Sequence, residues 1–351
     1  MLTECPLPSG ELPHPVNGLT TTPDLNAGRP VLLIPAVMGG GAPDARTRSA
    51  AAALHRRGLV NALGEGVSWG RPVLARRRLN PSVHRWSLLL DFSERLADRV
   101  SQCLLTSRFS RLPLVIGGDH SCAVGTWSGV ARALRNRGGS TDVPQADPAR
   151  ERPDAPESQQ LGLLWVDAHL DAHTPRSSRS KQAHGMPLAM LLGEGPRTLT
   201  GLAGPRPVLD AARVVVLGAR SWEPAEARRL SRLGVRVMTA EEVRSRGLAE
   251  CTAQALELVR GGPGASLPWG LSLDVDAIDP VDAPATGTPV PGGLSLRELI
   301  PALAGLARMP GLQALEMTEY NPRLDPDCTT AARLTRLLAA LLAAPPLRAP
   351  P

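Results

Sequence analysis

One short stretch of the sequence combines an apolar run with side chains that bind metals. Leu161–Val166 predicts a buried strand, and Asp167, His169 and Asp171 follow it at alternate positions. In an extended chain these three side chains project from one face, about 6–7 Å apart at each step. Two carboxylates and an imidazole at the end of a buried strand repel one another or lose hydration unless a cation joins them. The pattern therefore predicts a metal site.

Three other predicted strands also end in polar clusters. They lead into Gly117-Gly118-Asp119-His120-Ser121, into Asp274-Val275-Asp276 and into Thr318-Glu319. Carboxylate and imidazole ligands without a thiolate favour Mn²⁺ over a structural zinc ion. Two ions a few ångströms apart can share a hydroxide, which is a strong nucleophile near neutral pH. Each cluster alone is also compatible with a turn or a helix cap, but their combination indicates a binuclear centre. The candidate ligands are His120, Asp167, His169, Asp171, Asp274 and Asp276.

Strands and helices alternate along the chain between these clusters. Apolar runs predict strands at residues 30–37, 112–116, 161–166, 213–218, 235–238, 269–273 and 312–317. Apolar periodicity predicts helices at residues 47–57, 92–105, 123–135, 186–192, 223–233, 241–259, 294–306 and 329–342. This alternation predicts a mostly parallel sheet with helices on both faces. In such sheets the binding crevice lies at the carboxyl ends of the strands, where all four clusters fall.

The length of 351 residues suits one large α/β domain, which we place at residues 30–343. We expect residues 1–29 to form a loose leader and residues 344–351 to form a tail. Residues 138–160 are poor in apolar side chains and rich in Pro, Asp and Ser. They predict a flexible surface insertion within the domain, because the alternation of strands and helices resumes after them.

Charge and cysteine usage limit the classes of partner. The formal net charge is +6, but the arginines are scattered and no stripe of basic and aromatic residues indicates nucleic-acid binding. Five widely spaced cysteines form neither a disulfide framework nor a zinc pair, which favours a reducing compartment. No signal peptide or membrane-spanning run is evident, so we expect a cytoplasmic protein without a membrane partner.

The four clusters together resemble the signature motifs of the ureohydrolase family, which includes arginase, agmatinase, guanidinobutyrase and formiminoglutamase. The motifs are GGDHS at 117–121, DAHLD at 167–171, SLDVDAIDP at 272–280 and EYNP at 319–322. The resemblance extends over about residues 30–342, without the insertion. It implies a three-layer αβα sandwich with a mostly parallel eight-stranded sheet, two Mn²⁺ per subunit, a homotrimer or homohexamer, and hydrolysis of a small guanidino substrate.

The resemblance also implies roles for individual residues. His120, Asp167, Asp171 and Asp274 would hold one Mn²⁺, while His169, Asp167, Asp274 and Asp276 would hold the other. A hydroxide bridging the metals would attack the guanidinium carbon, and collapse of the tetrahedral intermediate would release urea and an amine. The implied catalytic residues are His184, Glu319 and Asp171. Glu319 would pair with the substrate guanidinium, and His184 would shuttle protons, as an imidazole can near neutral pH.

Within the family the sequence is most similar to arginase, with departures at the amino-acid end of the site. Ser180 and Gln182 occupy the positions of an arginase serine and asparagine. His173 replaces an asparagine that binds the α-carboxylate. Ser221 and Glu223 replace two aspartates that read the α-amino group. Thr288 is expected to line the site and to orient Glu319 or the substrate.

We therefore expect hydrolysis of L-arginine to L-ornithine and urea. The alternatives are an agmatine or guanidinobutyrate hydrolase, or a non-catalytic binding or regulatory relative of the fold. A phosphatase- or deacetylase-like metal hydrolase is disfavoured, because the carboxylate of Glu319 beside the metals would repel an anionic phosphate.

Overall fold

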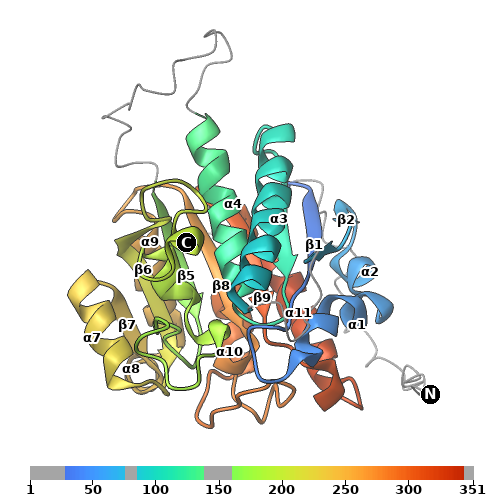
Figure 1. Ribbon diagram of the computed structural model, residues 1–351. Coiled ribbons are helices and arrows are strands. Elements are labelled where there is room, and N and C mark those ends of the chain that lie inside the picture. The colour runs from blue at the N-terminus through green and yellow to red at the C-terminus, as the bar shows by residue number, and fades with distance from the viewer. Residues whose placement is uncertain (1–27, 76–84, 138–159, 344–351) are drawn as a thin grey trace, which may run out of the picture.

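The computed structural model describes residues 28–75, 85–137 and 160–343 (Figure 1). The leader at residues 1–29 lies outside the described residues except for its last two positions. The insertion at 138–160 lies outside them except for its last residue, and the tail at 344–351 lies outside them entirely. The proposed domain bounds and the flexibility of the insertion therefore stay predictions.

A nine-stranded sheet forms the centre of the described fold. Its strand order is β2-β1-β4-β9-β8-β5-β6-β7, and β3 also pairs with β1. The strands are β1 (Val31–Val37), β2 (Val67–Trp69), β3 (Val73–Leu74), β4 (Leu112–Ile116), β5 (Leu161–Val166), β6 (Leu209–Ala219), β7 (Arg236–Thr239), β8 (Trp269–Asp274) and β9 (Leu312–Thr318). Every ladder between these named strands is parallel. The predicted parallel sheet is confirmed, with nine strands in place of eight.

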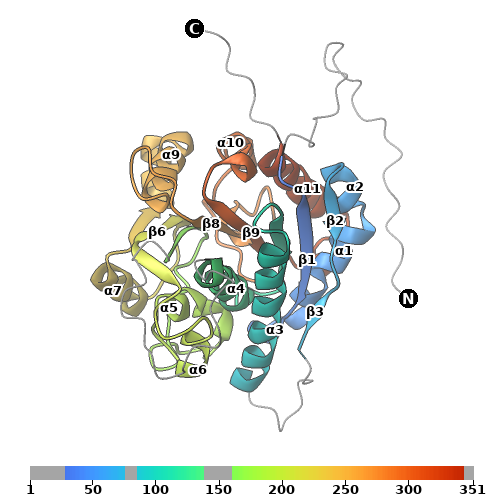
Figure 2. The ribbon, with the colours of Figure 1, turned by 90° about the horizontal axis from the view of Figure 1, so that it is seen from above.

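Helices cover both faces of the sheet and complete three layers (Figure 2). The described helices are α1 (Ala50–Arg56), α2 (Leu59–Leu63), α3 (Arg85–Thr106), α4 (Cys122–Arg137), α5 (Pro187–Leu191), α6 (Arg197–Thr200), α7 (Pro224–Leu233), α8 (Ala240–Arg246), α9 (Leu248–Val259), α10 (Leu296–Leu303) and α11 (Thr329–Leu342). One core packs α1, α2, α9, α10 and α11 against the sheet, and a second core packs α3, α4 and α5 against the opposite face. No described helix is long and apolar enough to cross a membrane.

Successive side chains of one strand enter different cores. Leu164 and Val166 of β5 belong to the first core, whereas Leu163 and Trp165 belong to the second. A strand buried on both faces therefore needs apolar residues at every position, which explains the continuous apolar run.

The structure corrects one predicted helix. Residues 241–259 were expected to form a single helix, but the chain forms α8 and α9 with Gly247 between them. Gly247 has a φ of 92°, a left-handed backbone conformation that glycine adopts without steric cost. The positive φ breaks the helix although the apolar periodicity continues across it.

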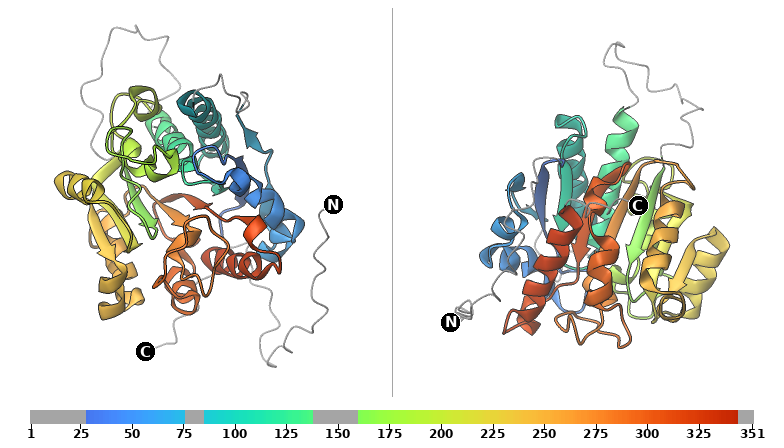
Figure 3. Two further views of the ribbon diagram at one scale, coloured as in Figure 1. Left: turned by 60° about the horizontal axis from the view of Figure 1, so that its bottom comes forward. Right: turned by 180° about the vertical axis from the view of Figure 1, so that it is seen from behind.

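The strand order brings the four polar clusters to one edge of the sheet. The strands β4, β9, β8 and β5 are consecutive neighbours, although β4 and β9 are far apart in the sequence. Since all of them are parallel, their carboxyl ends lie side by side, at the lower edge in Figure 1 and toward the viewer in the left view of Figure 3. The loops that carry the predicted ligands start at this edge.

Candidate metal centre

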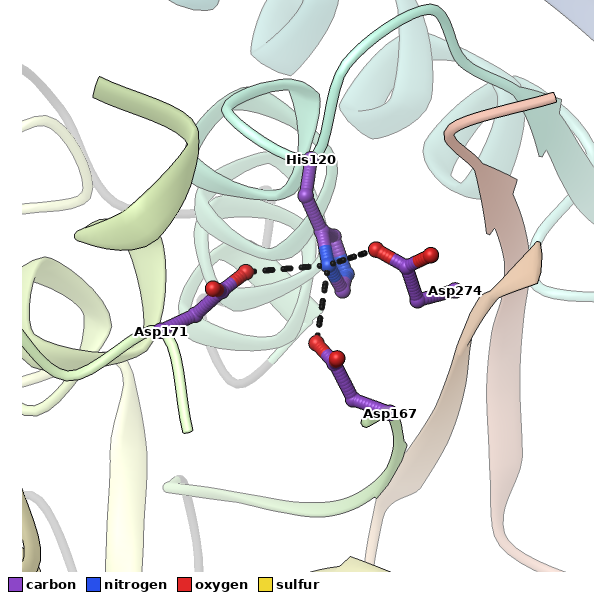
Figure 4. Close-up of side chains that lie close together, drawn as sticks. All are labelled: His120, Asp167, Asp171 and Asp274. Carbon is purple, nitrogen blue, oxygen red and sulfur yellow. Dashed lines mark ion pairs between the residues drawn. The ribbon is translucent and has the colours of Figure 1, made fainter. Parts of the chain in front are cut away.

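Four predicted ligands surround a single point at the carboxyl edge. His120 lies between β4 and α4, Asp167 and Asp171 follow β5, and Asp274 is the last residue of β8. The Nδ1 atom of His120 lies 3.2 Å from Asp167 Oδ2, 3.1 Å from Asp171 Oδ2 and 3.0 Å from Asp274 Oδ2 (Figure 4). All four residues are buried. We refer to them as the His120 cluster.

The Nδ1 atom of His120 lies at the centre of this cluster. Although three carboxylate oxygens lie close to it, Nδ1 of His120 has no hydrogen-bond partner among the described residues. The carboxylates approach the nitrogen from three directions (Figure 4). A buried nitrogen without a hydrogen bond, among three buried carboxylates, is costly unless a cation binds all four groups. The donor set and its geometry therefore fit a divalent metal ion.

A second cluster shares Asp167 with the first. The Nδ1 atom of His169 lies 3.2 Å from Asp276 Oδ2 and 3.6 Å from Asp167 Oδ1. We refer to Asp167, His169 and Asp276 as the His169 cluster; their ligand atoms lie within 4.8 Å of one another. Asp274 belongs only to the His120 cluster, and its Oδ1 accepts the backbone N–H of Asp276 at 2.8 Å. All six predicted ligands thus lie in two clusters joined through one carboxylate.

Close packing of the acidic groups shifts their protonation. Burial raises the pKa of Asp171 to about 7, and the neighbouring charge of Asp167 adds to this shift. Burial also raises the pKa of Asp274 well above its usual range, with further contributions from Asp276 and Asp167. Burial acts in the same direction on Asp167, but its contacts with His120 and His169 outweigh it and lower the pKa of Asp167. The metal-free clusters therefore retain protons that a bound cation must displace.

Trp165 contacts two of the candidate ligands, a role that the sequence analysis missed. Its indole ring stacks on the His120 imidazole with 4.0 Å between ring centroids and 11° between planes. Its Nε1–H also donates a hydrogen bond to Asp167 Oδ2 at 2.8 Å. In the sequence Trp165 is one of several apolar residues of a predicted strand, so no local pattern indicates this role.

Glu319 and His184 lie together beside the His120 cluster. Oε1 of Glu319 lies 3.0 Å from His184 Nδ1 and accepts the backbone N–H of His120 at 2.9 Å. Burial lowers the pKa of His184, but the hydrogen bond with Glu319 outweighs it and raises that pKa to about 9. The pairing with this buried carboxylate therefore favours the protonated form of His184.

Two of the acidic residues have unusual backbone conformations. Asp171 has a φ of 46° and Glu319 a φ of 65°. L-residues with positive φ cost free energy and persist where the surrounding structure holds them, often at functional sites. The backbone N–H of Glu319 donates to Gly118 O at 2.7 Å, and the Asp171 carbonyl accepts the N–H of Leu188 at 3.1 Å. These bonds fix the two turns that direct the carboxylates.

The residues expected at the amino-acid end lie around His173. The Nε2 atom of His173 lies 3.2 Å from Glu226 Oε2 and 3.7 Å from Glu223 Oε1, and hydrogen bonding to Glu226 raises the pKa of His173. The sequence analysis missed Glu226. It forms the capping box of α7 with Glu223, accepting that residue's backbone N–H at 2.8 Å, and it also accepts the N–H of Ala172 at 3.1 Å. Two glutamates three residues apart at a helix start were the available signal.

The other residues that were expected to contact the substrate differ in burial and in their hydrogen bonds. Ser180 is exposed and accepts the N–H of Gln182 at 3.3 Å. The side-chain oxygen of Gln182 is buried and has no hydrogen-bond partner among the residues described here. Ser221 is half-buried, and its N–H donates to Ala168 O at 3.0 Å. Thr288 was expected to orient Glu319 or the substrate, but its hydroxyl donates to Asp276 Oδ2 at 2.8 Å, so it contacts a candidate ligand.

Comparisons with known proteins agree with this geometry. The model of the Arginase family matches residues 80–344 of this chain. Arginase from Brevibacillus brevis is 37% identical over 254 residues, which cover 72% of this chain and 75% of that protein. The crystal structure of arginase from Bacillus subtilis superimposes with a TM-score of 0.73 at 30% identity, covering 89% of this chain and 98% of the other. The structure of Entamoeba histolytica arginase in complex with L-ornithine gives a TM-score of 0.74 at 25% identity, covering 90% and 98%.

Proposed function

The chain belongs to the arginase family, and we propose on that premise that it hydrolyses L-arginine to L-ornithine and urea at a site for two Mn²⁺ ions. Its general class, a hydrolase acting on amidine C–N bonds, follows from the family. The observation that carries the proposal for the metals is the pair of clusters that share Asp167, with the Nδ1 atom of His120 unsatisfied among three carboxylates.

The proposed ligand sets follow the two clusters. The His120 cluster would hold one ion and the His169 cluster the other, with Asp167 between them and with Asp274 as a second bridging candidate. Carboxylate and imidazole donors without thiolates suit Mn²⁺. When bound, two such ions act as Lewis acids and activate water for attack on the guanidinium carbon.

Glu319 and His184 would act on the substrate itself. Glu319 is a buried carboxylate at the end of β9, so it can form a charge-assisted hydrogen bond with a guanidinium group. The hydrogen bond with Glu319 raises the pKa of His184 to about 9 and so favours a proton on this imidazole. That proton can pass to the leaving amine nitrogen, which must be protonated before it departs. Asp171 completes the His120 cluster beside them.

The amino-acid end of L-arginine would lie near His173. Glu223 and Glu226 offer carboxylates to the α-amino group, whereas Ser180, Gln182 and His173 offer donors to the α-carboxylate. Gln182 also has a buried side-chain oxygen that a ligand could satisfy. In this proposal Thr288 acts on the metal side, through Asp276.

A second candidate function is hydrolysis of agmatine or a guanidino acid such as 4-guanidinobutyrate. One observation favours it: Glu223 lies 3.7 Å from His173 and 4.0 Å from Arg179, so two side chains of the protein already contact the carboxylate that would bind an α-amino group. Ser221 also stands where the resemblance implies an aspartate. L-arginine remains the preferred substrate because the most similar relatives named above are arginases.

Urea release from separate substrates tests the proposal. Purified protein loaded with Mn²⁺ is incubated with L-arginine, agmatine or 4-guanidinobutyrate, and urea is measured. We expect urea chiefly from L-arginine, no urea without metal, and lower activity in Glu319→Gln. Glu250→Gln is the matched control, because Glu250 is an exposed glutamate of α9 paired with Arg246. Urea chiefly from agmatine or 4-guanidinobutyrate would overturn L-arginine as the proposed substrate. Urea from none of the three substrates would overturn the proposed hydrolysis.

We also propose a cytoplasmic homo-oligomer, a trimer or a hexamer. The family resemblance supports the oligomer, and the four cysteines among the described residues form no disulfide bond, which is compatible with a reducing compartment. Light scattering coupled to size-exclusion chromatography measures the molar mass in solution. A monomer would contradict this part of the proposal.

A further inference from the structure

One buried carboxylate beside the metal clusters has no role in the proposed function. Glu316 lies on β9 with only 2% of its surface exposed. It accepts three hydrogen bonds: from Thr126 Oγ1 at 2.5 Å, from Trp127 Nε1 at 3.2 Å and from Ser272 Oγ at 2.8 Å. A buried carboxylate is costly without such donors. Three donors from α4 and β8 therefore hold Glu316 in one position.

Ser272 connects this carboxylate to a candidate metal ligand. Its Oγ atom lies 3.0 Å from Nε2 of His120 on one side and 2.8 Å from Oε2 of Glu316 on the other. A serine hydroxyl has a single hydrogen. Since a carboxylate only accepts, that hydrogen points to Glu316, and the oxygen lone pair of Ser272 faces the imidazole. Nε2 of His120 must then carry the ring hydrogen.

This arrangement determines what the other ring nitrogen can do. In a neutral imidazole with hydrogen on Nε2, the Nδ1 atom has a free lone pair. Nδ1 is the atom that lies among Asp167, Asp171 and Asp274 without a hydrogen bond from the described residues. The chain Glu316–Ser272–His120 thus directs a lone pair at the centre of the His120 cluster.

We propose that Glu316 and Ser272 are positioning residues that hold His120 in its Nε2–H tautomer and so set the metal affinity of the His120 cluster. The inference rests on the metal site of the proposed function and deepens it. Neither residue belongs to the two clusters, so both act through His120. Loss of such an outer hydrogen bond to a ligating histidine typically weakens metal binding about 10–100-fold.

A matched pair of substitutions tests this role. Ser272→Ala and Thr126→Val each delete one hydroxyl that donates to Glu316, but only Ser272 also contacts His120. Mn²⁺ is titrated into metal-free protein by calorimetry, with electron paramagnetic resonance to count bound ions. We expect Ser272→Ala to lower the affinity for one of the two Mn²⁺ ions by about 10–100-fold. The affinity for the other ion should stay within about threefold of the wild-type value. Thr126→Val should retain wild-type affinity for both ions.

Substitutions at Glu316 give the same comparison if Ser272→Ala does not fold. Glu316→Gln can keep an oxygen for the Ser272 hydroxyl, so it should bind Mn²⁺ nearly as the wild type does. Glu316→Met removes that acceptor and should weaken the same ion as Ser272→Ala. If Glu316 acted only through packing, Glu316→Met, whose side chain has a similar volume, would keep the wild-type affinity as well.

The outcomes separate this inference from the proposed activity, because the measurement needs no turnover. Unchanged affinity in Ser272→Ala and Glu316→Met, or an equal loss in Thr126→Val, would overturn the positioning role. A wild-type protein that binds fewer than two Mn²⁺ ions would overturn it together with the metal site. Two bound ions without urea production would refute the proposed function and leave the positioning role standing.

Discussion

Among the described residues, only Asp167 belongs to both the His120 cluster and the His169 cluster. This shared position leads to a quantitative prediction. An ion that binds only the folded protein stabilises it by about 2.7 kcal/mol when its free concentration is 100 times Kd. If each ion contributes this much, two ions add about 5 kcal/mol to the free energy of unfolding of the wild type. Asp276→Asn alters only the His169 cluster and should keep about half of this gain. Asp167→Asn alters both clusters and should lose nearly all of it.

Chemical unfolding with and without Mn²⁺ measures these gains for each variant. Only the difference that Mn²⁺ makes within one variant enters the comparison, so a change in metal-free stability does not affect it. Asp98→Asn serves as a control because that carboxylate is 74% exposed on α3, and it should keep the full gain. The reasoning would be refuted if Asp167→Asn kept half of the gain, or if Asp276→Asn lost all of it.

Three further outcomes follow from the same geometry. Glu319→Gln should lower kcat/KM for L-arginine by about 10–150-fold, the value of a charged hydrogen bond, while both Mn²⁺ ions still bind; weakened metal binding in calorimetry would assign Glu319 another role. His184→Asn should lower kcat by about 10²–10⁴-fold with little change in KM, as loss of a proton donor does; steady-state kinetics would contradict this if only KM rose. Because burial raises the pKa of Asp171 to about 7, Mn²⁺ binding near neutral pH should release protons and weaken as the pH falls. Calorimetry in two buffers of different ionisation enthalpy measures that release, and a heat independent of the buffer would contradict it.

Long buried elements of this fold are predictable from local sequence. The bounds of β4 and β5 agree with the predicted strands, since strands buried on both faces are continuous apolar runs. The bounds of α11 also agree with the prediction. The structure differs at β2 and β3, which have three and two residues, because such short strands show no periodicity and depend on pairing with β1.

Contacts between distant segments were not predictable in the same way. Glu226 reaches His173 and Ala172 across more than fifty residues, and only the packing of α7 against the loop after β5 makes this contact. Trp165 and Glu316 read as ordinary strand residues until the stacked ring and the three donors are seen. Their roles depend on neighbours that no local pattern specifies.

The sequence by itself determined the types of the metal-binding side chains and their places directly after buried strands, because both are local properties of the chain. Only the tertiary structure decided which of these strands are neighbours. The order β4-β9-β8-β5 places His120, Asp167, Asp274 and Glu319 together. Strand pairing depends on contacts between distant segments, because the helices must pack on both faces of the sheet. It therefore decides that Asp167 belongs to both clusters and that His120 lies between three carboxylates and Ser272.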